Sequence, residues 1–126
     1  MSKTIVHTKG APEPIGPYSQ AVLVNGTLYI SGQICLDPES GELKNADVKE
    51  EAHRCMLNLK AVLAAAGMDF SHVVKTGIFL TDMGSFAVVN EVYGQYFESE
   101  FPARETVEVS ALPKQVNVEI SMVAVK

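Results

Sequence analysis

Polar side chains suited to chemistry on a small molecule recur at a few separated points of the chain. Tyr18 follows a loop rich in proline and glycine, and Ser31 and Gly32 stand where a predicted strand ends. Arg104 opens one of the last two predicted strands, and Glu119 lies in the other. Arginine offers a planar fork of donors to an anion, and an ionised glutamate can accept a proton. The residue types therefore indicate anion binding and proton transfer, provided that the fold brings them together.

Other common catalytic arrangements have little support in the sequence. His7, His53 and His72 lie on three different predicted elements, and neither cysteine stands at ligand spacing from them, so no metal is expected. The chain has no G-x-S-x-G motif for a serine nucleophile and no glycine-rich phosphate loop. Cys55 falls on the inward face of a predicted helix, which favours a buried thiol over a nucleophile.

Length and charge narrow the range of functions further. The 126 residues are expected to form one domain over residues 1–126. Ten basic against fifteen acidic side chains give a net charge of -5, so nucleic acid is not an expected partner. No segment approaches the roughly 18 apolar residues of a membrane span, so no membrane partner is expected. Two isolated cysteines favour a reducing, cytoplasmic location.

About six strands and two helices are expected to position the polar residues. Asn25-Gly26 between two apolar runs predicts a β-hairpin with a type I′ turn. Asp47, followed three residues later by Glu50, predicts the start of a helix whose apolar stripe ends at Gly67. The other strands are expected near Ile5 and over residues 73–80, 104–110 and 116–125, with a second helix over residues 81–97. The order is then β-β-β-α-β-α-β-β.

Two helices can cover only one face of such a sheet. The last two strands, interpreted as a hairpin, place Val107 and Val109 toward the helices together with Ile120. Arg104 and Glu119 then share the opposite, uncovered face. A face that mixes charged, hydroxyl and β-branched side chains is typical of a subunit interface or a ligand pocket. We therefore expect a homo-oligomer with sites where subunits meet.

A series of short motifs runs in order through essentially the whole chain. In the first two-thirds they are Gly16-Pro17-Tyr18-Ser19-Gln20, Ser31-Gly32-Gln33, Val74-Lys75-Thr76 and Asn90-Glu91-Val92-Tyr93. Toward the end they are Phe101-Pro102-Ala103-Arg104, Val107-Glu108-Val109, Leu112-Pro113-Lys114 and Val118-Glu119-Ile120. In this set and order the sequence resembles the RidA family, also called YjgF/UK114.

The resemblance implies a chorismate-mutase-like α+β fold with a mixed sheet, assembled as a homotrimer with the sheets inside and the helices outside. It implies hydrolytic deamination of 2-imino acids and their enamines, such as 2-iminobutanoate and 2-iminopropanoate, to 2-keto acids and ammonia without a cofactor. The implied substrate-binding residues are Tyr18, Ser31, Gly32, Asn90, Arg104 and Thr106. Several relatives carry cysteine at the position of Thr106, so their thiol-dependent properties are not expected here.

Three catalytic roles are physically reasonable within that reaction. Arg104 can hold the substrate carboxylate with two parallel hydrogen bonds, which fixes the adjacent C=N carbon. Glu119 can aim a water at this carbon and accept its proton. Tyr18 can close the site across a subunit boundary. An iminium is already a good electrophile, so no covalent intermediate with the protein is required.

Other interpretations stay open at this point. Arg104 could pair with Glu108 or Glu119 across an interface, and Glu119 could orient the arginine without touching water. Tyr18 could be a packing aromatic, and Ser31 and Asn90 could be structural hydrogen-bonding residues. The same clefts could bind 2-keto acids or other small carboxylates without turnover. Some relatives are described as ribonucleases, a function against which the acidic charge argues.

Overall fold

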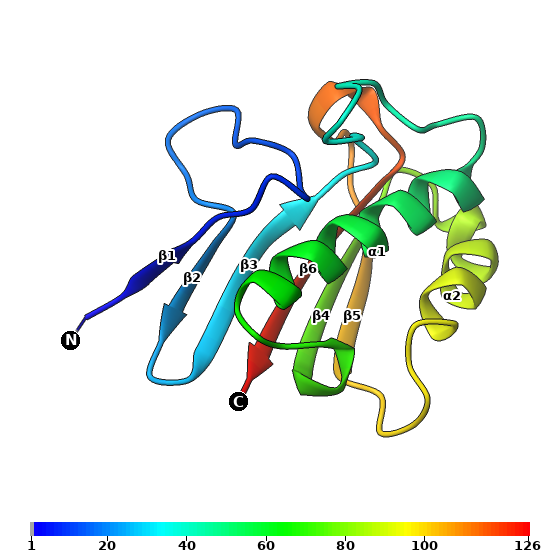
Figure 1. Cartoon of the computed structure of the whole chain (residues 1–126). Helices are drawn as coiled ribbons and strands as arrows, with labels where there is room; N and C mark the ends of the chain where they lie inside the picture. Colours follow the sequence, from blue (N-terminus) through cyan, green and yellow to red (C-terminus); the bar gives the residue numbers. More distant parts are fainter. Residues whose placement is uncertain (1) are drawn as a thin grey trace.

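The computed structural model describes residues 2–126, which form one six-stranded sheet with two helices on one of its faces (Figure 1). The elements are β1 (Thr4–Val6), β2 (Ala21–Val24), β3 (Thr27–Gln33), α1 (Val48–Ala65), β4 (Val73–Leu80), α2 (Phe86–Gly94), β5 (Ala103–Glu108) and β6 (Val118–Val125). The strand order in the sheet is β1-β2-β3-β6-β4-β5, and only β4 and β5 run parallel. The predicted α+β class and order of elements are confirmed.

The first helix is capped as its sequence predicts. The side chain of Asp47 accepts a hydrogen bond from the backbone N–H of Glu50 at 2.8 Å, and a cap of this kind stabilises a helix by about 1 kcal/mol. The residues of the predicted stripe that are buried against the sheet are Ala52, Cys55, Met56, Leu59, Val62 and Leu63. This stripe packs on β3 and β6 and forms the centre of the core. Within residues 2–126, no helix combines the length and the apolar character needed to cross a membrane.

The predicted hairpin joins β2 to β3. Asn25 and Gly26 have positive φ angles of 48° and 79°, which a type I′ turn requires at both central positions. A Cβ atom at Gly26 would also lie only 2.8 Å from the backbone oxygen of Lys126. The turn residues therefore satisfy both the backbone conformation and the close approach of the end of β6.

A β-bulge interrupts the pairing between β3 and β6. Their register holds up to Ile30 and resumes at Gln33, so Ser31 and Gly32 together oppose Ser121 alone. A bulge bends its strand and redirects the neighbouring side chains, and bulges are common beside functional sites. The predicted site residues Ser31 and Gly32 thus lie at a local irregularity of the sheet, in the middle of the molecule.

The second helix is shorter than predicted. The apolar pattern indicated a helix over residues 81–97, but α2 spans only Phe86–Gly94. The side chain of Asp82 accepts a hydrogen bond from the backbone N–H of Gly84 at 2.8 Å and stabilises a separate 3₁₀ turn over Met83–Ser85. Within α2, Val89, Val92 and Tyr93 are buried against the sheet.

The last two strands do not form the predicted hairpin. β4 lies between them, antiparallel to β6 on one side and parallel to β5 on the other. Parallel neighbours need a crossover connection, and α2 lies in the connection from β4 to β5. The strand β6 is inserted between β3 and β4 at the centre of the sheet (Figure 1). The connection between β5 and β6 covers residues 109–117, and its length also suits a hairpin with a longer loop. For this reason the sequence pattern predicted a hairpin that the structure does not contain.

The parallel register also reverses the predicted orientation of β5. Arg104 pairs with Thr76, which is buried beneath α2, so Arg104 faces the helices. Val107 pairs with Phe79 and faces the uncovered side, the reverse of the prediction. Glu119 pairs with Phe79 from the other side and shares that uncovered face. Arg104 and Glu119 therefore lie on opposite faces of one sheet, and the prediction that they share a face was wrong.

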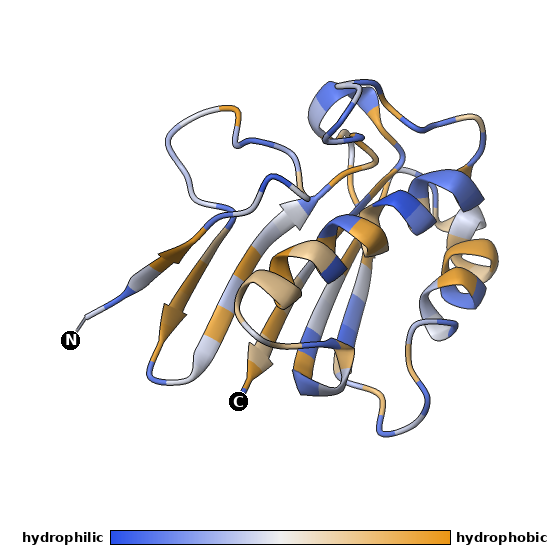
Figure 2. Cartoon of the chain, viewed as in Figure 1, coloured by the Kyte–Doolittle hydropathy of each residue, from blue (hydrophilic) through white to orange (hydrophobic). Residues whose placement is uncertain are grey.

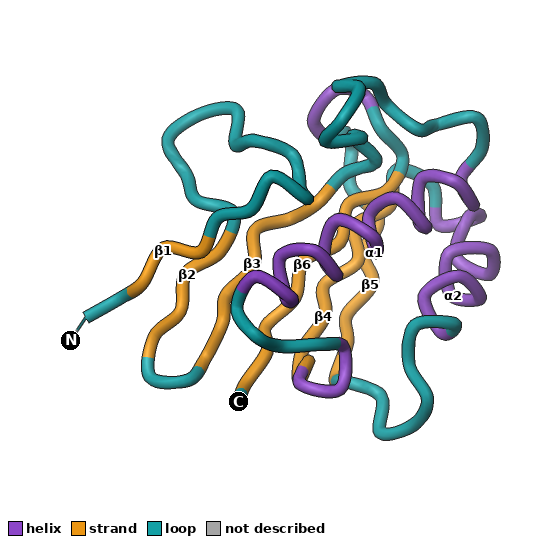
Figure 3. Tube along the Cα trace, viewed as in Figure 1, coloured by secondary structure: helices purple, strands orange, loops and turns teal. Residues whose placement is uncertain are grey.

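Within residues 2–126, both helices pack on one face of the sheet and leave the other uncovered, as predicted (Figure 1). Apolar residues are distributed along the strands (Figure 2). On the uncovered face Ile5, Tyr29, Val107 and Val125 are between 42% and 54% exposed. Exposed apolar side chains on a sheet face that no helix covers are typical of an interaction surface. The loop between β1 and β2, the connection from β3 to α1 and the loop before β6 lie near one end of the sheet (Figure 3).

Candidate functional site

Arg104 lies at the edge of the sheet, where three residues of α2 surround its side chain. The Nη1 atom donates a hydrogen bond to Oδ1 of Asn90 at 2.8 Å. The guanidinium carbon lies 5.2 Å from the centre of the Tyr93 ring and 5.6 Å from that of the Phe86 ring. Cation–π attraction acts at these distances and contributes about 0.5–1 kcal/mol at an exposed site. We call Phe86, Asn90, Tyr93 and Arg104 the arginine cluster; it holds the guanidinium ready for a planar anion.

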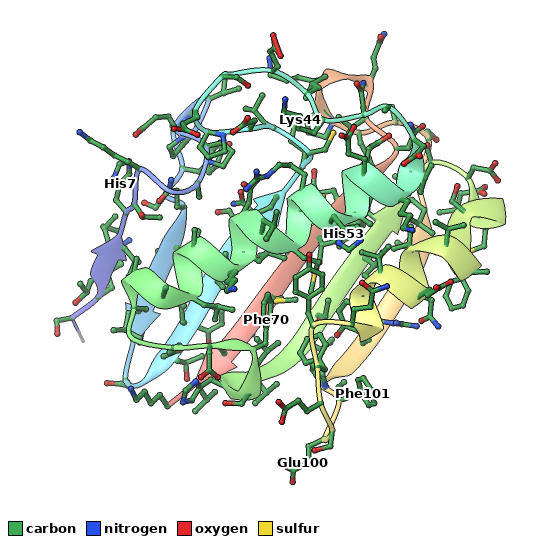
Figure 4. All side chains as sticks on the ribbon, turned by 45° about the vertical axis from the view of Figure 1, so that its right-hand side comes forward. His7, Lys44, His53, Phe70, Glu100 and Phe101 are labelled. Carbon is green, nitrogen blue, oxygen red and sulfur yellow. The ribbon has the colours of Figure 1, made fainter. Side chains whose placement is uncertain are left out.

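A cleft of about 430 Å³ opens beside the arginine cluster. Its lining residues are Asn90, Tyr93, Gly94, Phe101, Pro102 and Arg104. Phe101 lies near the start of β5 (Figure 4). A larger hollow of about 500 Å³ lies between the turn at Phe70 and the loop after α2, but neither Arg104 nor Glu119 lines it. The smaller cleft is therefore the candidate site for a small carboxylate, because it contains the guanidinium.

Tyr93 is a site residue that the sequence analysis missed. Its hydroxyl donates a hydrogen bond to Oγ1 of Thr76 at 2.9 Å, deep between α2 and β4. Burial raises the pKa of the Tyr93 hydroxyl, which keeps the ring neutral beneath Arg104. Tyr93 was named from the sequence only as part of the motif Asn90-Glu91-Val92-Tyr93. Its spacing of three residues from Asn90, which places both on one side of a helix, was the signal that could have identified it.

Glu119 lies beside the β-bulge on the uncovered face. A Cβ atom at Gly32 would lie 2.8 Å from Cδ of Glu119, so glycine is the residue that leaves room for this carboxylate. Burial raises the pKa of the half-buried Glu119 carboxyl above its ordinary 4.5. Within residues 2–126 no donor or cation is paired with it to oppose that effect. A carboxylate in this environment takes up a proton more readily than an ordinary glutamate.

Ser31 anchors the loop that carries Tyr18 to the bulge. Its Oγ donates a hydrogen bond to the backbone oxygen of Ser19 at 2.6 Å, and its N–H donates to that of Gln20 at 2.9 Å. Tyr18 is 53% exposed, and its hydroxyl accepts a hydrogen bond from the N–H of Ile15 at 3.3 Å. Tyr18 is the residue next to Ser19, whose backbone oxygen is hydrogen-bonded to the bulge. We call Tyr18, Ser31, Gly32 and Glu119 the bulge cluster.

Gln20 shapes the same loop and was also missed as a functional residue. Its side chain is buried, and Nε2 donates hydrogen bonds to the backbone oxygens of Thr8, Ala11 and Pro12 at 3.0, 3.2 and 3.0 Å. Its Oε1 accepts a hydrogen bond from the N–H of Thr8 at 2.7 Å. A buried amide with this many partners is fully satisfied and rigid. Gln20 therefore holds the proline-rich loop from which Tyr18 extends.

Thr106 lies on the same side of the sheet as Arg104. It pairs with Ile78 of β4, which is buried under the helices. The Oγ1 atom of Thr106 is buried and has no hydrogen-bond partner within residues 2–126.

The structure therefore separates the predicted site residues into two groups. Asn90, Arg104 and Thr106 lie on the helix-covered face or its edge, whereas Tyr18, Ser31, Gly32 and Glu119 belong to the bulge cluster.

The two cysteines are buried, free thiols. Burial raises the pKa of Cys35 to about 11 and that of Cys55 well above its ordinary value. A thiol that stays protonated is a poor nucleophile and a poor metal ligand. Within residues 2–126, no three side chains of His, Cys, Asp or Glu gather as a possible metal site.

The family model described as Endoribonuclease L-PSP matches residues 8–126. This match covers nearly all of the chain, including every residue of both clusters. The chain belongs to the RidA family. Membership was expected from the sequence motifs.

The RidA-family chain is similar to proteins of bacteria and animals over its whole length. It is 57% identical over 127 residues to protein DfrA of Myxococcus xanthus, covering 99% of this chain and 97% of that protein. It is 52% identical over 124 residues to the human 2-iminobutanoate/2-iminopropanoate deaminase, covering 98% and 90%. The crystal structure of E. coli TdcF with bound serine matches with a TM-score of 0.94 and 40% identity, covering 98% of each chain.

Proposed function

We propose that this chain hydrolyses 2-imino acids and their enamines, 2-iminobutanoate and 2-iminopropanoate among them, to 2-keto acids and ammonia. The observation that carries the proposal is the guanidinium of Arg104, held by Asn90 and Tyr93 in a cleft sized for a small organic acid. The identity of 52% to a deaminase of that name supports the reaction. The serine bound to TdcF supports a ligand with an α-carboxylate.

The proposed mechanism uses only water and side chains. Arg104 binds the substrate carboxylate through two parallel hydrogen bonds and so fixes the neighbouring C=N carbon. Glu119 accepts a proton from a water whose oxygen bonds to the iminium carbon, and the π electrons of the C=N bond move to nitrogen, giving a tetrahedral carbinolamine. The same carboxyl then returns this proton to the amino nitrogen, the C–N bond breaks with release of ammonia, and the hydroxyl proton passes to the carboxylate as the C=O bond forms. The raised pKa of Glu119 suits it to both transfers.

We infer further that each site is shared between copies of the chain in a homotrimer. Arg104 and Glu119 lie on opposite faces of the sheet of one chain, so one substrate cannot reach both from within a single copy. If the β5 edge of one copy packs beside the bulge of the next, the two clusters face each other. The uncovered apolar face supplies the surface for such packing. In that arrangement Tyr18 closes the site, and Ser31, Gly32, Asn90 and Thr106 contact the substrate.

A coupled assay tests the reaction. Threonine dehydratase generates 2-iminobutanoate, and release of 2-ketobutyrate is followed with the wild-type protein, with Arg104→Ala and without either. We expect faster release with the wild type and a loss of at least about a hundredfold in kcat/KM for Arg104→Ala, since both hydrogen bonds to the carboxylate are lost. If the wild type binds 2-ketobutyrate in a calorimetric titration but leaves the rate unchanged, the chain is a binding module instead.

Mixing two inactive variants tests the shared site. Arg104→Ala and Glu119→Gln proteins are co-refolded so that their subunits assort at random. In a ring where each site takes Arg104 from one copy and Glu119 from its neighbour, about a quarter of the sites regain both residues, and about a quarter of wild-type activity returns. Sites built within single chains would stay inactive after mixing, and this result would contradict the shared site.

Two further expectations accompany the proposal. We propose that the protein acts in the cytoplasm as a single domain over residues 1–126, and the buried free thiols of Cys35 and Cys55 support a reducing compartment. The name of the family model raises cleavage of RNA as an alternative. A net charge of -5 disfavours binding to a polyanion, and incubation with labelled RNA in low salt, with no cleavage expected, checks this point.

A further inference from the structure

Glu51 in α1 carries a carboxylate that the proposed reaction does not use. Glu51 is only 1% exposed, and within residues 2–126 no lysine, arginine or histidine forms an ion pair with its carboxylate. An ionised carboxylate without a counter-charge is costly to bury unless neutral donors satisfy it. The identity of those donors therefore indicates what the side chain is for.

Asn117 supplies two donors to Glu51, and the thiol of Cys35 forms a further side-chain hydrogen bond with the same carboxylate. The backbone N–H of Asn117 donates to Oε1 at 2.8 Å, and its Nδ2 donates to Oε2 at 2.6 Å. The other side of Asn117 is bound to Thr81, whose hydroxyl donates to Oδ1 at 3.1 Å and whose N–H donates to the backbone oxygen at 3.2 Å. Glu51 thus fixes Asn117 between α1 and the end of β4 by charge-assisted hydrogen bonds.

Asn117 is the residue immediately before β6, and Glu119 is the second residue of that strand. A second contact from α1 holds the residue between them, because the Sγ of Cys55 donates to the backbone oxygen of Val118 at 3.7 Å. Cys55 lies one helical turn after Glu51. Glu51 and Cys55 of α1 therefore form hydrogen bonds with the two residues that precede Glu119.

We propose that Glu51 is a positioning residue for the hydrolytic step. Through Asn117 it sets the point at which β6 begins, and so the place where Glu119 presents its carboxylate beside Gly32. The inference rests on the proposed function of Glu119. Arg104 lies on the other face and on a different strand, so its grip on the substrate is independent of Glu51. A carboxylate displaced by a fraction of an ångström still meets a bound substrate, but at a less productive angle.

The variant Glu51→Gln tests this role. Glutamine keeps one oxygen for the backbone N–H of Asn117 but turns an NH₂ group toward the NH₂ group of the asparagine side chain, so one hydrogen bond is lost. We expect kcat to fall about tenfold while KM changes less than about twofold, because only the placement of Glu119 is altered. Asn117→Ala keeps the backbone donor and loses only the side chain, so a smaller loss of kcat, about threefold, is expected.

A double variant provides the rescue. Adding Asn117→Asp to Glu51→Gln transfers the carboxylate across the contact, so the glutamine NH₂ again meets an acceptor and Thr81 still has an oxygen to bind. We expect kcat to return to within about threefold of the wild type. Asn117→Asp alone sets two carboxylates against each other and is expected to lose more kcat than Glu51→Gln. A general loss of stability would not follow this pattern of loss and recovery.

Leu63→Ala is the matched control, since it opens a cavity under α1 at a buried residue three turns away from Glu51. We expect it to lower the melting temperature and leave kcat unchanged. The inference is overturned if Glu51→Gln and Asn117→Ala keep wild-type kcat, if the double variant shows no recovery, or if Leu63→Ala loses as much kcat. Absence of hydrolysis by the wild type would overturn the proposed function itself, and this outcome is distinct from all of these.

Discussion

The arginine cluster and the bulge cluster are built by different means. Arg104 is held by side chains: an amide oxygen at 2.8 Å and two aromatic rings of a single helix. Glu119 is held by the backbone, through a bulge, a glycine and the fixed start of its strand. The first cluster surrounds a permanent charge with attractive contacts. The second leaves its carboxylate without a partner within residues 2–126.

This difference matches what the proposed function requires of each cluster. A guanidinium that binds a carboxylate gains from being rigid and always ionised. A group that takes a proton and gives it back gains from an environment that favours neither state strongly, and partial burial without a partner raises the pKa of Glu119 in that direction. Substitutions should therefore separate into effects on KM at the arginine cluster and effects on kcat at the bulge cluster.

Of the substitutions considered, Glu119→Gln is expected to have the largest effect on kcat. Glutamine fills the same space but cannot accept a proton from water, so kcat should fall about a hundredfold while KM stays within about threefold. Steady-state kinetics in the dehydratase-coupled assay measure both constants. A rise in KM with unchanged kcat would show that Glu119 binds the substrate and does not activate water.

Gly32→Ala is expected to have the next largest effect. The added methyl group would approach the carboxylate of Glu119 to within 2.8 Å of Cδ, so the side chain or the bulge must move. We expect kcat to fall about tenfold, with little change in KM, because positioning alone is disturbed. Val62→Ala, which opens a cavity under α1 and touches neither cluster, is the matched control for stability. A fall in kcat for Val62→Ala equal to that for Gly32→Ala would contradict this explanation.

Asn90→Ala is expected to change KM and to leave kcat nearly unaltered. Removing the amide frees Nη1 of Arg104, whose 2.8 Å hydrogen bond to Oδ1 is lost, and the guanidinium then samples more orientations. We expect KM to rise about fivefold with kcat within about twofold, since one hydrogen bond to a charged group is removed. Asn90→Asp, which keeps an acceptor, should bind better than Asn90→Ala. Equal losses in kcat for both variants would break the proposed division between the clusters.

The smallest effect concerns pH. Burial raises the pKa of Glu119 above 4.5, so as the pH falls the base is protonated earlier than an ordinary glutamate would be. We expect kcat to decline on the acid side with a midpoint above that value, and we expect this acid limb to be missing in Glu119→Gln. The profile is measured with saturating substrate from about pH 4 to about pH 8, corrected for spontaneous hydrolysis. A limb that persists in Glu119→Gln would assign the titration to another group.

The parts of the fold that depend on local chemistry were predictable. The Asp47 cap, the Asn25-Gly26 turn and the stripe of α1 each depend on residues a few positions apart, and each was confirmed. The neighbour of β5 depends instead on which distant strand it meets, and no residue within β5 encodes this. A helix over residues 81–97 was predicted because Asp82 resembles a helix cap. It caps a 3₁₀ turn instead, and its local hydrogen bond is the same in both cases.

The candidate site was predictable in its residue types but not in its geometry. The alternation of side chains along the strand of Arg104 was predicted correctly. Which face of the sheet Arg104 lies on is determined by its pairing with Thr76, and the sequence does not show this pairing. Tyr93 and Gln20 stand in the sequence only as members of longer motifs, and no local pattern gives either residue a role of its own. Their hydrogen-bond partners, Thr76 and the backbone near Thr8, come from other segments and had to be seen in the structure.

The central position of β6 has a consequence for how the protein is made. The other five strands are synthesised first, but β3 and β4 have no contact as neighbours until residues 118–125 pair with both. A nascent chain that still lacks this segment leaves two strand edges unpaired and the core stripe of α1 without half of its sheet. Folding on the ribosome is therefore expected to wait until β6 has left the exit tunnel.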